Sequence, residues 1–311
     1  MKERDMINRS FTWKTIFAFT AIYVIWGSTY LAIRYAVETI PPFLMMGARS
    51  VIAGLILVLW SRSRGAVELR REHLPALFII GISFFLVGHG LLAWAQQRVP
   101  SGLAAVLVAS EPLTIFLIER FFTRDTKIKM QGMFGLLLGF AAIVYLIAST
   151  KGIDTSDTDI FASIAIVFGA SSWAAGAVYS RVAKLPGSPV TSAGIELIIG
   201  GIFLLLAGAA FGEMREFRID AVSLRSLLSL GYLIVFGSVI TFSAYIWLLG
   251  HTSATRISTH TYVNPLIAIL LGWLIASEEL TIEMLIATVF IVISVALVLN
   301  DPQKSSSRDS H

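Results

Sequence analysis

Long apolar runs separated by short polar stretches cover almost the whole chain. A membrane-spanning helix needs about 20 apolar residues, and ten runs reach that length. None of them alternates apolar and polar residues with a period of two, which argues against a β-barrel. The pattern therefore predicts ten transmembrane helices, at residues 14–36, 42–61, 74–95, 102–122, 130–149, 159–180, 189–211, 225–249, 256–276 and 281–299.

The second half of the chain repeats the pattern of the first. An offset of 147 residues places Trp26 on Trp173, and an offset of 153 places Pro112 on Pro265. Such internal duplication is a common plan of membrane transporters. Because five helices per repeat is an odd number, the second copy should enter the membrane from the opposite side. We predict an all-α integral membrane protein with two inverted five-helix repeats, at residues 14–149 and 159–299. Polar cytoplasmic tails at residues 1–13 and 300–311 should flank the repeats.

Composition supports a lipid environment. The 311 residues are 56% hydrophobic and only 14% charged, with a mean hydropathy of +0.78, whereas soluble domains carry about 25% charged residues. The chain has no cysteine, which excludes disulfides and thiolate metal sites, and we expect no metal and no cofactor. The net charge of +4 is spread over many loops, so we expect no nucleic-acid partner.

The distribution of basic residues predicts the orientation. If the amino terminus is cytoplasmic, 17 of the 24 Lys and Arg residues fall in cytoplasmic segments and 6 in outer loops. Positive residues accumulate on the cytoplasmic side of membrane proteins. We therefore expect a multi-pass protein of the cell (inner) membrane with both termini in the cytoplasm.

Several short motifs carry a family resemblance. The first repeat contains IWGSTY at 25–30, followed by Arg34, and VPSGLAA at 99–105. The second repeat contains SW at 172–173, GIE at 194–196 and YVNPL at 262–266. Through these motifs the chain, from about residue 15 to 299, resembles the EamA family of the drug/metabolite transporter superfamily in its ten-helix, two-repeat form. The resemblance implies a carrier of the cytoplasmic membrane that exports amino acids or other small metabolites.

Ionisable residues inside the predicted spans are candidates for function. A charged side chain at the bilayer centre costs about 2.5–3.5 kcal/mol on insertion scales, so such residues are rare unless they serve a purpose. A histidine alone in a bundle is more often a hydrogen-bonded packing residue than a ligand. The ionisable residues well inside the spans are Arg49, His89, Glu111, Glu196 and His260.

Three of these residues suggest specific roles. Arg49 and Glu196 are equivalent under the offset of 147, and we interpret them as two poles of one cavity that binds a zwitterion. The alternative is that hydroxyls or backbone carbonyls hold each of them as a structural group. Glu111 lies near the membrane midplane and is a candidate proton site, because burial disfavours the charged form of a carboxylate. Its alternative role is a structural carboxylate, hydrogen-bonded or paired with Arg49.

Aromatic and amide side chains complete the predicted site. Trp26 and Trp173 lie well inside their spans, which favours a cavity over the aromatic belt found at membrane interfaces. Pro112 and Pro265 fall inside the fourth and ninth spans and should bend them, either as gating kinks or as ordinary packing kinks. The predicted substrate-binding or cavity residues are Trp26, Tyr30, Arg49, His89, Trp173, Glu196, Tyr245, Tyr262 and Asn264, and His260 is a further candidate.

The sequence lacks the common motifs of ATPases and of two classes of hydrolase, which reduces the number of possible functions. No GxxxxGK[ST] loop is present, so this chain should not hydrolyse ATP, and neither HExxH nor GxSxG occurs. A channel would require rings of like residues, whereas this chain has isolated charges. We predict a secondary active transporter that works by alternating access, with a small-molecule substrate, the lipid bilayer and protons as partners. The alternative is a channel or facilitator without ion coupling, and an intramembrane enzyme is a more distant one.

Overall fold

A computed structural model describes residues 13–65, 69–122, 130–149, 157–249 and 260–299. Within these ranges the regular elements are all helical and no strand occurs. Eight helical stretches of the described chain are long and apolar enough to cross a membrane. Two shorter apolar helices, Val263–Ala276 and Ile282–Leu297, lie where the ninth and tenth spans are predicted.

In the first repeat, several elements join end to end into longer helices. The stretch Trp13–Ala36 is continuous through the π-helical turn η1, and Arg71–Ala95 is continuous through the π-helical turn η3. The elements are α2 (Trp13–Thr20), η1 (Ala21–Ile25), α3 (Trp26–Ala36), α4 (Pro42–Ser63), the 3₁₀ turn η2 (Arg71–His73), α5 (Leu74–Gly81), η3 (Ile82–His89), α6 (Gly90–Ala95), α7 (Ser101–Val108), α8 (Glu111–Phe122) and α9 (Met130–Ser149).

The second repeat contains a third π-helical turn, η6. This turn lies between α13 and α14, at a position similar to that of η3 in the first repeat. The elements are α10 (Asp157–Ser180), α11 (Pro189–Ala210), α12 (Glu213–Glu216), the 3₁₀ turn η5 (Ile219–Ala221), α13 (Leu224–Tyr232), η6 (Leu233–Ile240), α14 (Thr241–Leu249), α16 (His260–Ala276) and α17 (Ile282–Leu299).

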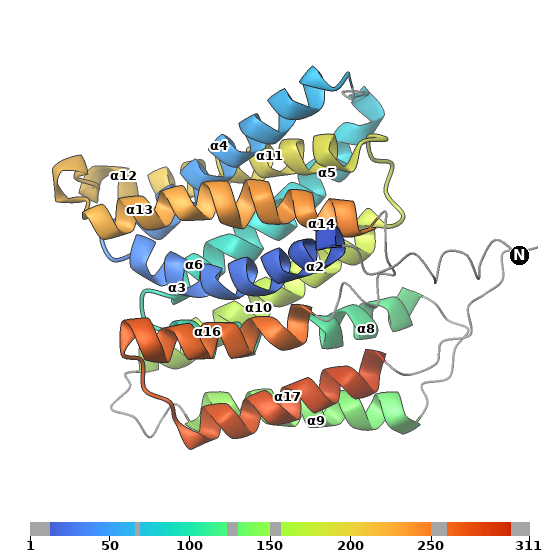
Figure 1. The fold of residues 1–311 in the computed structure, drawn as a ribbon, viewed down its shortest axis with the longest axis vertical. Helices are drawn as coiled ribbons and strands as arrows, with labels where there is room; N and C mark the ends of the chain where they lie inside the picture. The colour runs from blue at the N-terminus through green and yellow to red at the C-terminus, as the bar shows by residue number, and fades with distance from the viewer. Residues whose placement is uncertain (1–12, 66–68, 123–129, 150–156, 250–259, 300–311) are drawn as a thin grey trace, which may run out of the picture.

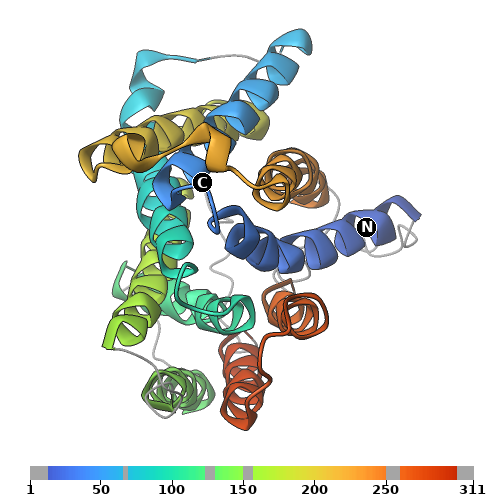
Figure 2. The same cartoon turned by 90° about the vertical axis from the view of Figure 1, so that its left-hand side faces the viewer.

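Helices of the two repeats interleave. The most extensive packing joins α4 to α11, α9 to α17, η3 to α10, and α3 to α16, and each of these pairs takes one helix from each repeat. In Figure 1 the helices run side by side across the view, with α9 and α17 together at the bottom and α4 and α11 at the top. Figure 2 looks along most of them and shows α9 and α17 as a separate pair at one edge.

Glycines bring α4 and α11 into close contact. A Cβ added to Gly54 would lie 2.6 Å from the carbonyl oxygen of Gly194, and one added to Gly201 would lie 2.8 Å from the backbone nitrogen of Val51. Residue numbers rise along α4 as they fall along α11, so the two helices run antiparallel. The Ser61 hydroxyl hydrogen-bonds the Thr191 hydroxyl at 2.5 Å at the end of this contact. Small residues permit this approach of two backbones.

The two prolines have different surroundings. The fourth predicted span is present as the membrane-length stretch Ser101–Ile118, but it is interrupted: α7 ends at Val108, and a new helix, α8, begins at Glu111. Pro112 is the second residue of that new helix, where a helical N–H has no intrahelical partner in any case. Pro265 does lie inside α16, where its missing N–H leaves the carbonyl of residue 261 without a helical bond.

Candidate functional site

Aromatic rings from three helices meet in the middle of the bundle. The ring centroid of Trp26, the first residue of α3, lies 5.4 Å from that of Tyr245 and 5.1 Å from that of His260. The rings of Tyr245 and His260 are 6.4 Å apart. The three side chains lie close to one another, and each is partly exposed. Together with Arg49 and Ser238 we call them the central cluster.

Arg49 projects from α4 toward the second repeat. Its Nε donates to the hydroxyl of Ser238 in η6 at 3.0 Å, and its Nη1 lies 3.6 Å from the sulfur of Met46. The Ser238 hydroxyl in turn donates to the carbonyl oxygen of Leu233 at 3.0 Å. The π-helical turn places this carbonyl five residues before the serine. The wide turn therefore orients the serine that holds the arginine.

Trp26 binds the same π-helical turn. Its indole Nε1 donates to the carbonyl oxygen of Gly237 at 3.2 Å. The next turn of α3 is also tied to the second repeat, because the hydroxyls of Ser28 and Tyr232 are hydrogen-bonded at 2.7 Å. The predicted cavity residue Trp26 and Arg49 thus bind adjacent residues of the same π-helical turn, Gly237 and Ser238.

His89 and Trp173 form a second aromatic group next to the cluster. Trp173 stacks on Phe84 at 4.2 Å, and its ring lies 4.9 Å from that of His89. The hydroxyl of Ser172 donates to the carbonyl oxygen of Ser83 in η3 at 3.1 Å. Arg49 lies within electrostatic range of the His89 imidazole, which places this group near the cluster.

Glu111 and Tyr30 lie on another side of the cluster. Glu111 is the first residue of α8, and its carboxyl lies within electrostatic range of the Tyr30 and Tyr245 hydroxyls. The backbone of Tyr30 accepts a hydrogen bond from the Gln96 amide at 2.8 Å. Glu111 forms no ion pair with Arg49, so the structure does not show the pairing that is the alternative role of Glu111.

Asn264 joins α16 to the first repeat. With its nitrogen facing them, the Asn264 amide donates to the carbonyl oxygens of His260 and Tyr23 at 3.1 and 3.2 Å. Tyr23 lies in η1, so each π-helical turn of the described chain accepts a hydrogen bond from a side chain of the other repeat. The side chain of Tyr262 lies outside the described residues.

Arg49 and Glu196 do not face each other. Along α11 the residues that approach α4 are Gly194, Ile198 and Gly201. Glu196 is two positions from the first two of these, which turns it by about 200° to the opposite face of the helix. Arg49 is likewise two positions from Gly47 and Val51, which face α11. The glycine contact between α4 and α11 therefore separates the two charges, and they cannot hold one small zwitterion between them.

Glu196 is buried without a partner. Its side chain is 7% exposed, and within the described chain no hydrogen bond or ion pair reaches its carboxylate. The helix packs there against α5, because a Cβ added to Gly81 would lie 2.9 Å from the Glu196 carbonyl oxygen. Glu196 thus belongs to the α5 side of α11, away from the central cluster.

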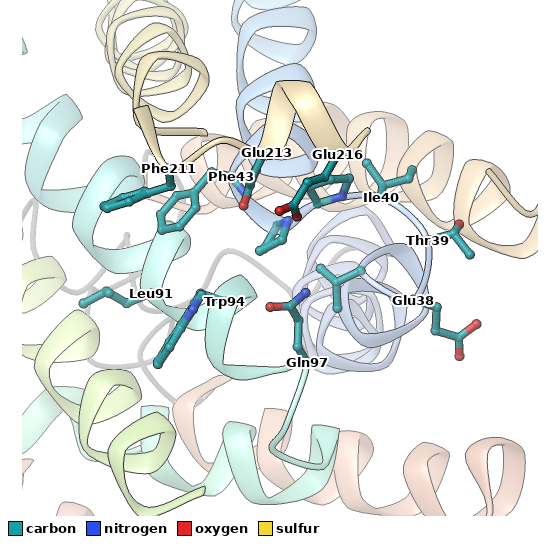
Figure 3. A pocket seen from close by; sticks show the side chains of 13 residues that line it. Glu38, Thr39, Ile40, Phe43, Leu91, Trp94, Gln97, Phe211, Glu213 and Glu216 are labelled. Atoms are coloured by element: carbon teal, nitrogen blue, oxygen red, sulfur yellow. The ribbon is translucent and has the colours of Figure 1, made fainter. Parts of the chain in front are cut away.

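A depression of about 710 Å³ opens at the end of the bundle where α4 begins. Figure 3 shows Phe43 and Phe211 on one side of it and Leu91 and Trp94 on the other, with Glu216 next to Glu213. Its lining residues are distinct from those of the central cluster. The depression is therefore a surface feature at one end and not the mid-bundle site.

Two carboxylates of the second repeat cap helices of the first at this same end. Glu213 accepts the backbone N–H groups of Phe43 at 3.2 Å and Leu44 at 2.9 Å, at the start of α4. Burial raises the pKa of the Glu213 carboxyl, although these two N–H groups oppose the shift. Negative charge is favourable at a helix N-terminus because the N–H groups there lack helical partners.

Glu278 caps α7 in the same way. It accepts the backbone N–H groups of Ser101 at 2.8 Å and Gly102 at 3.1 Å, and its Oε1 lies 3.4 Å from the Nε of Arg34. Neither capping glutamate stands out in the sequence, because both lie in polar loops that look like ordinary solvated charge. The prolines at positions 42 and 100 mark the capped helix starts and were the only available signal.

The described side chains offer no metal chemistry. Among them, no group of three or more His, Asp or Glu residues could hold a metal ion. What the arrangement provides is a buried cation, hydroxyls and aromatic rings contributed by both repeats. Groups of these kinds can contact the charged and the apolar parts of a small solute.

Comparison with protein families gives a match to each half. A model of the EamA-like transporter family matches residues 13–148 and again residues 160–300. The two matches agree with the duplication that the offsets predict.

Relatives match over nearly their whole length. YedA of Escherichia coli (strain K12), described as an uncharacterized inner membrane transporter, is 36% identical over 283 residues, or 90% of this chain and 89% of YedA. YvbV of Bacillus subtilis (strain 168), described as an uncharacterized transporter, is 25% identical over 92% of this chain and 91% of YvbV. One solved crystal structure has the same fold, with a TM-score of 0.64 and 22% identity over 93% of this chain and 98% of that one.

Proposed function

Because the chain belongs to the EamA-like transporter family, we propose that it is a secondary active transporter that exports amino acids or related small metabolites by alternating access. The observation that carries the proposal is the central cluster. Arg49 and Trp26 of the first repeat bind Ser238 and Gly237 of the second, in the middle of the bundle. Substrate sites of transporters built from repeats lie at that kind of interface.

The proposed topology has ten spans arranged as two inverted five-helix repeats, at residues 14–149 and 159–299. The odd number of helices per repeat and the excess of basic residues on one side support it. Both termini would lie in the cytoplasm, and the description of YedA as an inner membrane transporter supports the same membrane for this chain.

Coupling and gating belong to the same proposal. Glu111, near the cluster, is the candidate proton site. Pro265, which interrupts the hydrogen bonding of α16, and Pro112, at the break between α7 and α8, are the candidate gating positions. Trp173 and His89 would line the path beside the cluster.

Export from cells tests the function. Bacteria expressing the wild type, an empty vector or Trp26→Ala would be loaded with a peptide mixture, and secreted metabolites would be measured by mass spectrometry over time. Leu137→Ala, on an exposed position of α9, is the matched control. We expect one or a few compounds to accumulate outside only with the wild type and the control, at a rate that saturates with internal concentration and falls when a protonophore is added.

Three results would contradict parts of this proposal. Equal secretion from wild-type and vector cells, with the protein present in the membrane, would reject export. Flux that never saturates would indicate a channel, and saturable flux that is insensitive to the protonophore would indicate a facilitator without proton coupling.

A further inference from the structure

Arg49 carries a buried positive charge that no carboxylate of the described chain neutralises. Its side chain is 5% exposed, and its hydrogen-bond partners in the described chain are a neutral hydroxyl and a thioether. Removing a guanidinium from water is costly unless the charge is paired and its donors are satisfied. Glu196 lies beyond the α4–α11 contact, and Glu111 forms no ion pair with Arg49. The position of Arg49 therefore has a cost in stability that the fold itself does not offset.

The arginine is held so that one edge of its guanidinium stays available. Ser238 binds Nε and is itself fixed by its bond to the Leu233 carbonyl. Nη1 faces the sulfur of Met46, which is a weak acceptor. Nη2 lies beside Gly237, where even a Cβ would come within 3.5 Å of it. Glycine at this position leaves room next to Nη2, which has no acceptor among the described residues.

The aromatic part of the cluster adjoins that free edge. Trp26 binds the carbonyl of Gly237, the same residue that borders Nη2, and the rings of Tyr245 and His260 follow within 5.4 Å of Trp26. A solute with an anionic group at Nη2 would thus place its remainder against aromatic surface. This arrangement resembles other ligand sites, which are mostly apolar with a few placed polar groups.

We infer that Arg49 binds the carboxylate of the transported solute, and that this carboxylate rather than a zwitterion is what the site recognises. The inference rests on the proposed transport function and deepens it. A guanidinium presents paired N–H donors that match a carboxylate or a phosphate. The single positive charge of Arg49 balances a monoanion, whereas a phosphate monoester of about −1.5 to −2 would leave buried negative charge.

The position of Glu196 indicates that the amino group of a solute is not recognised together with its carboxylate. If Arg49 and Glu196 were two poles of one site, both the carboxylate and the ammonium of an amino acid would be required. Because they lie on opposite faces of the α4–α11 pair, Glu196 cannot bind the ammonium of a solute held by Arg49. Acids that lack the amino group should therefore bind as well as amino acids do.

Binding to the purified full chain in lipid nanodiscs tests the inference. The probes are three pools: the L-amino acids, their carboxamides, and the matching carboxylic acids without the amino group. The readouts are the thermal unfolding midpoint and tryptophan fluorescence. For the wild type we expect the first and third pools to bind and the carboxamides to bind more weakly by about ten-fold or more, since one charge-assisted bond is lost.

Variants then assign the effect to Arg49. Arg49→Gln should remove the difference between acids and carboxamides, and Arg49→Lys should keep part of it. Arg98→Gln removes an exposed arginine that lies over Trp94, outside the cluster, and should keep the full difference. If Arg49→Gln does not fold, Ser238→Ala retains the charge but releases Nε, and it should reduce the preference for acids.

Several outcomes would overturn the inference. For the wild type, these are equal binding of acids and carboxamides, loss of binding when the amino group is removed, or no binding by any pool. For the variants, the contradicting result is an unchanged preference for acids in Arg49→Gln. If Arg49→Gln does not fold, the same result in Ser238→Ala would contradict the inference. If cells nevertheless export a solute, the transport function stands and only the role of Arg49 falls. If export also fails in the cell assay, the function is rejected by that separate result.

Discussion

The indole Nε1 of Trp26 donates a hydrogen bond to the carbonyl oxygen of Gly237 at 3.2 Å, and this bond joins a helix of the first repeat to a π-helical turn of the second. The bond from Ser172 to the Ser83 carbonyl joins the repeats in the opposite sense. π-Helical turns leave carbonyl groups in altered register and are frequent at functional sites. In this protein the π-helical turns are where side chains of one repeat hydrogen-bond the backbone of the other.

Replacing Trp26 with phenylalanine should reveal what this bond contributes. An aromatic ring is retained, but it is smaller than the indole and the Gly237 carbonyl loses its donor, which together should cost about 1–2 kcal/mol of stability or more. Thermal unfolding of the purified protein measures the loss. Trp13→Phe, at an exposed position of α2, is the control and should leave the unfolding midpoint unchanged. An equal effect of both substitutions would argue against the bond.

A methyl group at Gly54 should separate α4 from α11. The added Cβ would lie 2.6 Å from the Gly194 carbonyl oxygen and 3.0 Å from the Ile198 nitrogen, and neither backbone atom can move alone. We expect Gly54→Ala to cost about 1–3 kcal/mol of stability. Gly231→Ala is the matched control, since nothing lies within 4 Å of its Cβ position in α13. There the change should stabilise slightly, because alanine favours helix over glycine.

The cap on α7 should depend on the charge of Glu278. Glu278→Gln weakens the hydrogen bonds from Ser101 and Gly102 and leaves Arg34 without its carboxylate. Loss of a helix cap costs about 0.5–2 kcal/mol, and we expect a value in that range from chemical or thermal unfolding. Glu279→Gln alters the neighbouring exposed residue and should have no effect. If the two substitutions behaved alike, the cap would not contribute to stability.

Glu213 should make stability depend on pH. Burial raises its pKa in the folded chain above the ordinary value of 4.5, with Glu216 acting in the same sense and the N–H groups of Phe43 and Leu44 opposing it. A carboxyl with a raised folded pKa stabilises the fold most below its unfolded pKa, and this contribution is lost as the pH rises through the folded pKa. The stability of the wild type relative to Glu213→Gln should therefore fall as the pH rises above 4.5.

Unfolding midpoints of both proteins across that pH range provide the measurement. In Glu216→Gln, on the same short helix, the contribution of Glu213 to stability should still depend on pH. The change should occur at lower pH, because one charge that repels the Glu213 carboxylate is removed. A difference between wild type and Glu213→Gln that stays constant with pH would show that Glu213 does not titrate in this range.

Glu196→Gln separates a role in transport from a role in binding. Glutamine is a neutral side chain of the same shape, so the protein should remain folded in the membrane. We expect binding of the acid pool to be unchanged, because Glu196 lies away from the central cluster. We expect export to fall, because a buried carboxylate without a partner among the described residues is costly unless it has a function. Export assays and nanodisc binding, run on the same variant, check this. Unchanged export would show that Glu196 takes no part in transport.

Particular residues show how far sequence reasoning extends. The structure buries Arg49 and places the rings of Trp26 and Tyr245 close together, while their role as substrate-binding residues stays a prediction from the sequence. Ser238 and Gly237 escaped notice because a serine or glycine in an apolar run is ordinary. Their importance depends on the π-helical turn, which is a matter of backbone register that packing decides. Glu213 escaped notice because its partners are backbone groups 170 and 169 residues away.

The sequence by itself determined that the chain is a duplicated, helical, lipid-embedded protein, and the family comparisons agree. It could do so because hydropathy, charge bias and repeat offsets are sums over local segments and do not depend on contacts. Only the tertiary structure decided which charges share a site. Arg49 and Glu196 are equivalent in the repeats, yet the glycine contact of α4 and α11 turns them to opposite sides, since the face that a helix presents is set by what it packs against.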